Sequence, residues 1–171
     1  MKWVLIVVGA LAALGVVLFV VGLVRPKTHV ATRTFRLAKP PADVWAVVSD
    51  FARVPEWFSE VSKIERIADS DGKPAWKETY GGRFEATVVT TEWVEPRKIV
   101  REILPSGPFS GSWTLELAPD GEGTRLTITE QGTVANPFFR GMMVFHDNYK
   151  TMTRYATALA RRLGTESAVV Q

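Results

Sequence analysis

Few side chains in this sequence are of the types that enzymes use as nucleophiles or general bases. The chain has no cysteine and only two histidines, His29 and His146. The Gly-x-Ser-x-Gly elbow, the phosphate-binding loop and the Gly-x-Gly-x-x-Gly run are all absent from it. Two distant histidines without a carboxylate cluster make a poor zinc or iron site. We therefore expect no metal and no cofactor, and the sequence names no catalytic residue.

Acid–base chemistry has one candidate pair, His146–Asp147. It follows the apolar Phe145 in a region with helical spacing, where an imidazole is able to exchange protons with a ligand at a cavity mouth. A solvated polar pair on the flank of a helix explains the same residues equally simply and is the favoured interpretation. Further polar candidates for anchoring a ligand are Glu78, Tyr80, Arg101, Glu130 and Tyr149. Their pattern does not single out a reaction, so whether the chain is an enzyme stays open.

Short segments rich in β-branched and aromatic residues would position these side chains. They are bounded by turn residues such as Gly81-Gly82, which are typical of hairpins. Apolar and polar residues alternate along several of them, as in half-buried antiparallel strands. The predicted strands cover residues 28–37, 61–68, 75–80, 84–94, 98–104, 110–117 and 124–133, and two short helices cover residues 42–51 and 55–58.

The last predicted element is a long amphipathic helix between Asn136 and Gly164. Its apolar residues recur at alternating steps of four and three, which places them on one face. A sheet with one apolar face has to be covered, and this helix is the only element long enough to do so. We therefore predict an α+β domain in which about seven antiparallel strands pack against the last helix. Residues 165–171 are predicted to be a flexible tail.

A run without charged or strongly polar side chains extends from Trp3 to Val24. As a helix it is about 33 Å long, against a hydrocarbon core of ~30 Å. The alternative is a cleaved signal peptide, but the possible cleavage site at Ala10-Leu11-Ala12 would leave a very short apolar region. We predict an uncleaved single-pass anchor over residues 1–27, followed by a domain over residues 28–164.

Charge bears on orientation and on partners. Basic residues follow the apolar run before the first acidic residue, Asp43: Arg25, Lys27, Arg33, Arg36 and Lys39. The positive-inside rule then predicts a cytoplasmic domain at the cell membrane, although the last three residues also fit as part of the folded domain. The net charge of +3 is small for a nucleic-acid binder, so no nucleic-acid partner is expected.

One stretch resembles the opening of the START-like (SRPBCC) superfamily, which includes the Bet v 1 allergens and the polyketide cyclase/dehydratase-like proteins. Residues 38–51 read AKPPADVWAVVSDF and are followed by Val54-Pro55-Glu56-Trp57. This is similar to the family's first strand, proline, Val-Trp pair, Asp-Phe and Pro-x-Trp turn. The resemblance implies the helix-grip fold, in which a curved sheet wraps around the last helix and leaves an apolar cavity. The membrane helix departs from the minimal family pattern.

The cavity implied by the resemblance would be lined by aromatic rings and by flexible thioethers, which suit an adaptable apolar site. Each of these residues taken singly also fits an ordinary core. The predicted ligand-binding residues are Trp57, Trp76, Tyr80, Trp93, Trp113, Phe138, Met142, Phe145, Tyr149 and Met152.

Three functions stay open. The first is a membrane-tethered domain that binds a small apolar or lipid-like ligand, and this is the leading prediction. The second is a polyketide cyclase/dehydratase-like enzyme, which converging ionisable groups in a deep cavity would favour. The third is a protein-interaction module, which a filled core would favour. The sequence does not determine the oligomeric state.

Overall fold

The computed structural model describes residues 1–105, 109–145 and 147–170. The helices are α1 (Lys2–Val24), α2 (Pro41–Val48), η1 (Phe51–Arg53), α3 (Val54–Trp57), α4 (Pro137–Met142), η2 (Met143–Phe145) and α5 (Asn148–Arg162). The strands are β1 (Thr28–Leu37), β2 (Val61–Ser70), β3 (Lys73–Tyr80), β4 (Phe84–Val94), β5 (Lys98–Ile103), β6 (Phe109–Asp120), β7 (Gly123–Val134) and β8 (Ser167–Val169). The predicted α+β helix-grip fold is confirmed.

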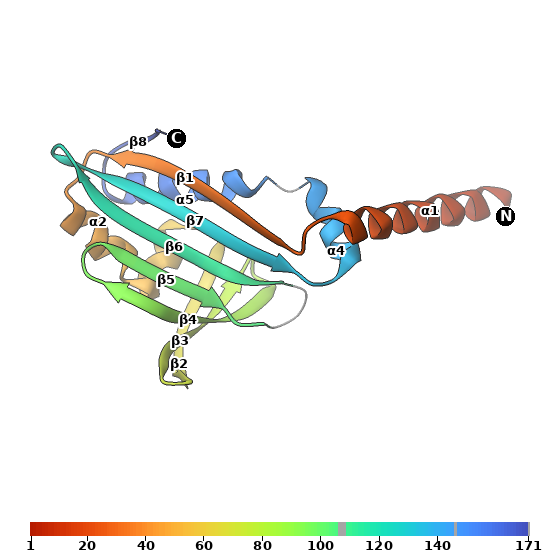
Figure 1. The fold of residues 1–171 in the computed structure, drawn as a ribbon, viewed down its shortest axis with the longest axis horizontal. Helices are drawn as coiled ribbons and strands as arrows, with labels where there is room; N and C mark the ends of the chain where they lie inside the picture. Colours follow the sequence, from red (N-terminus) through yellow and green to blue (C-terminus); the bar gives the residue numbers. More distant parts are fainter. Residues whose placement is uncertain (106–108, 146, 171) are drawn as a thin grey trace.

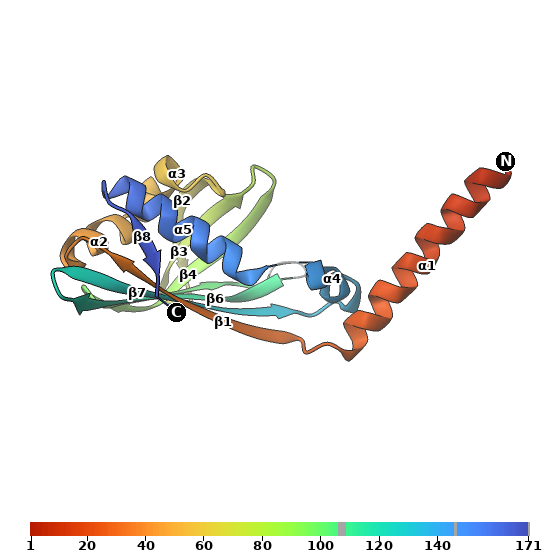
Figure 2. The same ribbon diagram turned by 90° about the horizontal axis from the view of Figure 1, so that it is seen from above.

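All strands form one antiparallel sheet with the order β2-β3-β4-β5-β6-β7-β1-β8. Strands β2 to β7 form a meander. A tight turn joins β2 to β3 at Asp71-Gly72, where both residues have positive φ. Strand β1 returns to the end of the meander and pairs with β7 from Thr28↔Thr133 to Leu37↔Thr124. The sheet is curved, and α5 crosses its concave side (Figure 1, Figure 2).

The eighth strand lies in the predicted flexible tail. Residues Ser167–Val169 pair with Phe35–Leu37 at the end of β1. Without β8 this stretch of β1 would be a sheet edge with unpaired backbone groups, which a few added residues can satisfy. Part of the tail is therefore ordered by the strand beside it.

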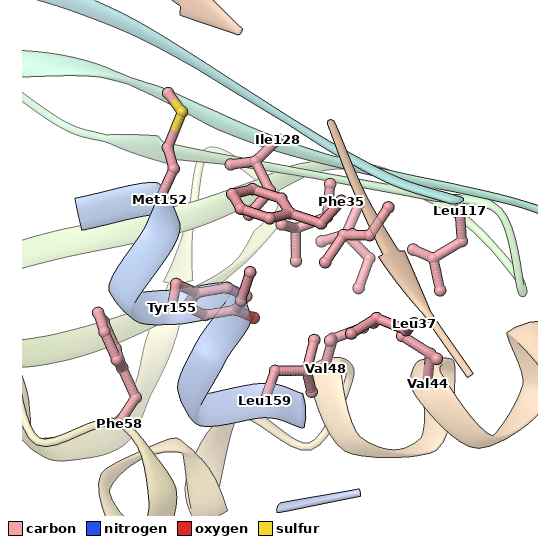
Figure 3. Close-up of a cluster of buried hydrophobic side chains, with 14 of the residues drawn as sticks. Phe35, Leu37, Val44, Val48, Phe58, Leu117, Ile128, Met152, Tyr155 and Leu159 are labelled. Carbon is pink, nitrogen blue, oxygen red and sulfur yellow. The ribbon is translucent and has the colours of Figure 1, made fainter. Parts of the chain in front are cut away.

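The core lies between the concave face of the sheet and α5. On α5, Met152, Ala156 and Leu159 follow the helical repeat and are completely buried. They face sheet residues such as Phe35 and Ile128, which are also buried (Figure 3). Helix α2 covers the far end of the same core with Val44 and Val48.

The prediction of one continuous last helix is wrong, because the chain divides there into α4, η2 and α5. Asp147 has an extended backbone, and its side chain accepts a hydrogen bond from the Tyr149 amide at 2.9 Å, which makes it the N-cap of α5. Asn136 caps α4 in the same way. The capping residue Asp147, within the apolar stripe, thus starts a second helix.

Helix α1 is long and apolar enough to cross a membrane. It projects from the end of the sheet at which β1 begins (Figure 2). Its final turns are in contact with α4, where Arg140 donates a hydrogen bond from Nε to the carbonyl of Gly22 at 2.6 Å.

Candidate functional site

A cavity of about 510 Å³ lies between the concave face of the sheet and helices α3 and α5. Its deep end is formed by buried apolar side chains, namely Val48, Phe51, Val54, Phe58, Val61, Val88 and Leu115. At the other end the lining residues are partly or fully exposed: Ser110, Gly111, Gln131, Gly132, Thr133 and Met143. The cavity therefore opens mainly where β6 begins and β7 ends.

An ion pair interrupts the apolar lining. Glu78 on β3 is only 2% exposed, and its Oε1 lies 2.5 Å from Nη1 of Arg101 on β5. The Arg101 guanidinium stacks 3.9 Å from the ring centroid of Phe51 and 5.1 Å from that of Trp76. These rings lower the cost of keeping the cation away from water. The strand positions bring the two charges together, although they are far apart in the sequence.

Tyr80 completes this cluster. Its hydroxyl donates a hydrogen bond to Oε2 of Glu78 at 2.5 Å. Burial raises the pKa of Tyr80 well above its ordinary value, and the negative charge of Glu78 and the hydrogen bond to it act in the same direction, while Arg101 opposes them. The phenol thus stays protonated at neutral pH and stabilises the carboxylate.

The Arg101 guanidinium keeps free hydrogen-bonding capacity. Within the described part of the chain, its buried Nε and Nη2 have no hydrogen-bond partner. A buried donor without a partner costs about 1–3 kcal/mol, and more when it is charged. Arg101 lines the cavity, but these two donor nitrogens are themselves buried, so an oxygen acceptor of a ligand would reach them after a shift of the side chain.

A second polar pair lies at the open end. His29 Nε2 is 3.2 Å from Oε1 of Glu130, and both residues line the cavity. Gly132 makes room for the imidazole, because a Cβ at that position would collide with the ring. The pair joins the first residues of β1 to the last part of β7.

The predicted site residues take different places. Tyr80 and Trp113 line the cavity. Trp57 and Trp76 lie behind the lining, with ring centroids 5.2 Å from Tyr155 and 5.0 Å from Phe51 respectively. Met152 is completely buried in the core.

Four predicted residues lie outside the cavity. Trp93 is 47% exposed and packs on Trp45, while Phe138, Met142 and Tyr149 are 38%, 46% and 46% exposed. The physical reason for Phe138 and Met142 is the break before α5, which separates the first part of the stripe from the helix that covers the sheet. Tyr149 lies after the break, in the first turn of α5, where the Arg33 guanidinium is 5.1 Å from its ring centroid. The side chain of Phe145 and all of His146 lie outside the described residues. Asp147 acts as a helix cap.

Phe51, Tyr155 and His29 also line the cavity, although they are not among the predicted ligand-binding residues. Tyr155 is buried among the rings of Trp57, Phe58 and Trp113, and burial raises the pKa of its phenol. Its position three residues after Met152 was a usable signal, because this spacing keeps both on one helix face. Within the described residues, no group of three or more His, Cys, Asp or Glu side chains is placed to hold a metal ion.

Comparisons with known proteins agree with this geometry. The sequence profile of the family described as polyketide cyclase/dehydrase and lipid transport matches residues 28–164. None of the curated proteins matches the chain.

Solved structures show the same fold at low sequence identity. A START superfamily protein from Mycobacterium smegmatis superposes with a TM-score of 0.64 at 19% identity, covering 80% of this chain and 97% of that one. The Zhui aromatase/cyclase from a Streptomyces species has a TM-score of 0.66 at 17% identity, covering 80% and 94%. Norcoclaurine synthase from Thalictrum flavum has a TM-score of 0.64 at 17% identity, covering 80% and 93%.

Proposed function

This chain belongs to the polyketide cyclase/dehydrase and lipid transport family, and we propose that it is a membrane-tethered domain that binds one small lipid-like molecule in its cavity. The family and the fold support a ligand-binding domain. The observation that carries the proposal is an apolar cavity of about 510 Å³ with the partly unpaired guanidinium of Arg101 in its wall. Volumes of roughly 300–1,000 Å³ with few polar groups are typical of small-molecule sites.

The electrostatics of the site favour a particular polar group on the ligand. Glu78 already balances the charge of Arg101 at 2.5 Å. A ligand carboxylate would bring a second negative charge next to Glu78, which costs free energy in a poorly solvated site. An uncharged oxygen, such as a carbonyl or hydroxyl, accepts from Nε and Nη2 without that cost. The proposed ligand is therefore a mainly apolar molecule with an uncharged oxygen.

The tether is helix α1. A cleaved signal peptide has no reason to fit the mature domain, whereas Gly22 of α1 approaches α4 so closely that a Cβ there would collide with the Pro137 carbonyl. Arg140 also binds the carbonyl of Gly22. This specific contact supports an anchor over residues 1–27 that stays attached to the domain over residues 28–164. The basic flank after Val24 supports a cytoplasmic domain.

Catalysis of the cyclase type is the second candidate. The observation in its favour is the same pair of free N–H groups on Arg101, which would stabilise negative charge developing on a substrate carbonyl. The pair His29–Glu130 supplies a further titratable group on the wall. An enzyme would release a bound polyketone-like probe with a changed mass or absorbance, whereas a binding domain would release it unaltered.

Native mass spectrometry of the full-length chain tests the proposal. We expect a bound small molecule on the parent protein and its loss in Ile103→Trp, because Ile103 lines the cavity and the indole would fill it. Val100→Trp is the matched control, since Val100 lies on the same strand with its side chain on the other face. A parent protein that carries no molecule, combined with strong destabilisation by Ile103→Trp, would instead support a filled core and an interaction module.

A further inference from the structure

One face of α1 is specialised for contact with α4. The residues of α1 that are not exposed are Gly15, Leu18, Val21 and Gly22, and they follow the helical repeat. A Cβ on Gly22 would collide with the Pro137 carbonyl, and a Cβ on Gly141 would collide with the Leu18 carbonyl. Pro137 thus lies beside Gly22 and Gly141 beside Leu18, so that α4 runs antiparallel to α1 and back along the anchor.

This contact sets the depth of α4. At ~1.5 Å per residue, Leu18 lies about 9 Å from the end of α1 at Val24. If α1 spans a bilayer of ~30 Å hydrocarbon thickness, α4 lies inside the hydrocarbon layer, near the edge on the side of the domain, and not in the water beyond it. Figure 2 shows α4 beside the end of α1, at the same end of the sheet as the start of β1.

The polar groups of α4 have partners within the protein. The Asn136 side chain accepts from the amides of Phe138 and Phe139 at 2.8 and 3.4 Å. Arg140 is 6% exposed and donates to the carbonyls of Gly22, Val134 and Ala135 at 2.6, 2.9 and 3.1 Å. Such internal pairing is what backbone and charged groups require when lipid surrounds them.

The outward side of this segment is apolar. Phe138 and Phe139 are each 38% exposed, and Met142 and Val144 are each 46% exposed. Four large apolar side chains on a short segment are unusual on a surface that faces water. From Trp3 to Val24, the large exposed side chains of α1 are apolar as well.

The same segment forms part of the cavity rim. Met143 of η2, Phe109 and Val134 line the open end of the cavity. The ring of Phe139 packs 6.0 Å from that of Phe109, and the Val134 carbonyl binds Arg140. The rim is thus physically joined to the segment that sits at the hydrocarbon edge.

From this arrangement we propose that α4 and η2 are embedded in the leaflet from which α1 emerges, and that the cavity takes its ligand directly from that leaflet. The proposal rests on the proposed function, and it names the source of the ligand as the bilayer rather than the aqueous phase. The anchor then has a second role, because it holds the cavity mouth at a fixed depth.

Embedding is tested by single-cysteine labelling, for which the absence of native cysteines is an advantage. A fluorophore is attached to Met142→Cys, or to Glu122→Cys in the exposed β6–β7 turn as the control, in the full-length chain in liposomes. We expect acyl-chain nitroxide lipids to quench the label at position 142 and aqueous iodide to leave it unquenched, with the reverse at position 122. Iodide quenching at both positions would overturn the proposal. Protection of position 142 from both quenchers would mean that a second protein chain covers it, and would also overturn it.

Uptake is tested with a photo-crosslinkable fatty acid methyl ester. In one arm the probe is supplied in the bilayer and the rate of capture is measured. In the other arm the probe is mixed with the protein in detergent and the occupancy at equilibrium is measured. For Phe138→Glu/Met142→Glu we expect capture from the bilayer to be about tenfold or more slower. Two charged side chains are costly in hydrocarbon, so the segment would withdraw from the bilayer and take the cavity mouth with it. Occupancy in detergent should stay at the parent level. The control Val94→Glu/Val169→Glu adds the same charge at exposed valines outside this segment and should behave like the parent.

The outcomes separate the two proposals. Equal capture from the bilayer by parent and Phe138→Glu/Met142→Glu would overturn uptake through this segment and leave the binding function intact. If the parent captured the probe neither from the bilayer nor in detergent, the proposed function and uptake would both be overturned.

Discussion

Arg101 is the side chain that most restricts what the cavity accepts. Its charge is balanced by Glu78, the rings of Phe51 and Trp76 lie against it, and its buried Nε and Nη2 have no hydrogen-bond partner among the described residues. Buried donors without partners raise the free energy of the empty protein, and a ligand that accepts hydrogen bonds from these two nitrogens would remove that cost. The proposed selectivity for an oxygen-bearing apolar molecule therefore rests on one residue and its three neighbours.

Two methionines on the predicted stripe should respond differently to truncation. Met152 is completely buried, so Met152→Ala should lower the free energy of unfolding by about 2–5 kcal/mol, because a cavity replaces its side chain. Met142 is 46% exposed, so Met142→Ala should change it by less than ~0.5 kcal/mol. Urea unfolding of the full-length chain in detergent measures both. Equal losses for the two variants would contradict the division of the last helix.

The buried tyrosines predict a loss of stability at alkaline pH. Burial, followed by the charge of Glu78, raises the pKa of Tyr80 in the folded protein. Above pH ~10 the unfolded chain releases this phenolic proton while the folded protein keeps it, so stability falls by about 1.4 kcal/mol per pH unit for each such group. Below pH ~10 both states keep the proton and the effect is absent.

Tyr80→Phe removes this group from the titration. Between pH 10 and 11 the free energy of unfolding should fall less steeply in the variant than in the parent. The difference between the two slopes should be about 1.4 kcal/mol per pH unit. Exposed Trp93 supplies the control variant, Trp93→Phe, which should keep the parental slope because neither side chain ionises in this range. Identical slopes for all three proteins would show that Tyr80 ionises normally.

At the level of elements, α4 connects α1 with the rim of the cavity. The sequence placed these residues in the last helix, whereas capping by Asn136 and Asp147 makes α4 and α5 separate helices. One of them covers the sheet and the other packs on α1. Because the apolar stripe is divided, α5 packs against the sheet while α4 packs against α1.

The glycines of α1 test the contact with α4. Gly22→Leu should lower the free energy of unfolding by about 1–3 kcal/mol, because its side chain would meet the backbone of Pro137. Gly9→Leu is a matched control in the same helix, since no atom lies within 4 Å of a Cβ there. Unfolding in detergent by a fluorescence signal from the domain measures both. Unchanged stability in Gly22→Leu would show that the anchor is not packed on the domain.

At the level of the whole molecule, the prediction concerns membrane attachment and side. The full-length chain should stay with membranes after alkaline carbonate washing, because an apolar helix of about 33 Å matches the hydrocarbon core. Protease added to spheroplasts should leave the domain intact, because the basic flank after Val24 favours the cytoplasm.

Charge reversal is the control for the side of the membrane. Arg25→Glu/Lys27→Glu should increase the fraction of chains that external protease digests. A mature N-terminus mapped near Ala13 would show a cleaved signal peptide instead, and complete digestion of the parent would place the domain outside the cytoplasm.

The sequence by itself determined the architecture of the domain. Alternating residues and glycine turns predicted the meander, and the opening similar to the START-like proteins predicted the helix-grip fold, which the structure confirms. These features are local, because periods of two and of about 3.6 residues decide which side chains share a face. The apolar run of α1 is also a local feature, recognisable from its length and its lack of charged side chains.

Only the tertiary structure decided the site. Glu78 and Arg101 lie on different strands, and His29 meets Glu130 across 101 residues of chain, so only strand register brings these groups together. Phe138 and Met142 fit the helical stripe yet lie outside the cavity, because the cap that Asp147 provides outweighs the periodicity at the break before α5. The fit of Gly22 and Gly141 also depends on helices more than a hundred residues apart. Register, capping and close approach are interactions between segments, and no window along the chain contains them.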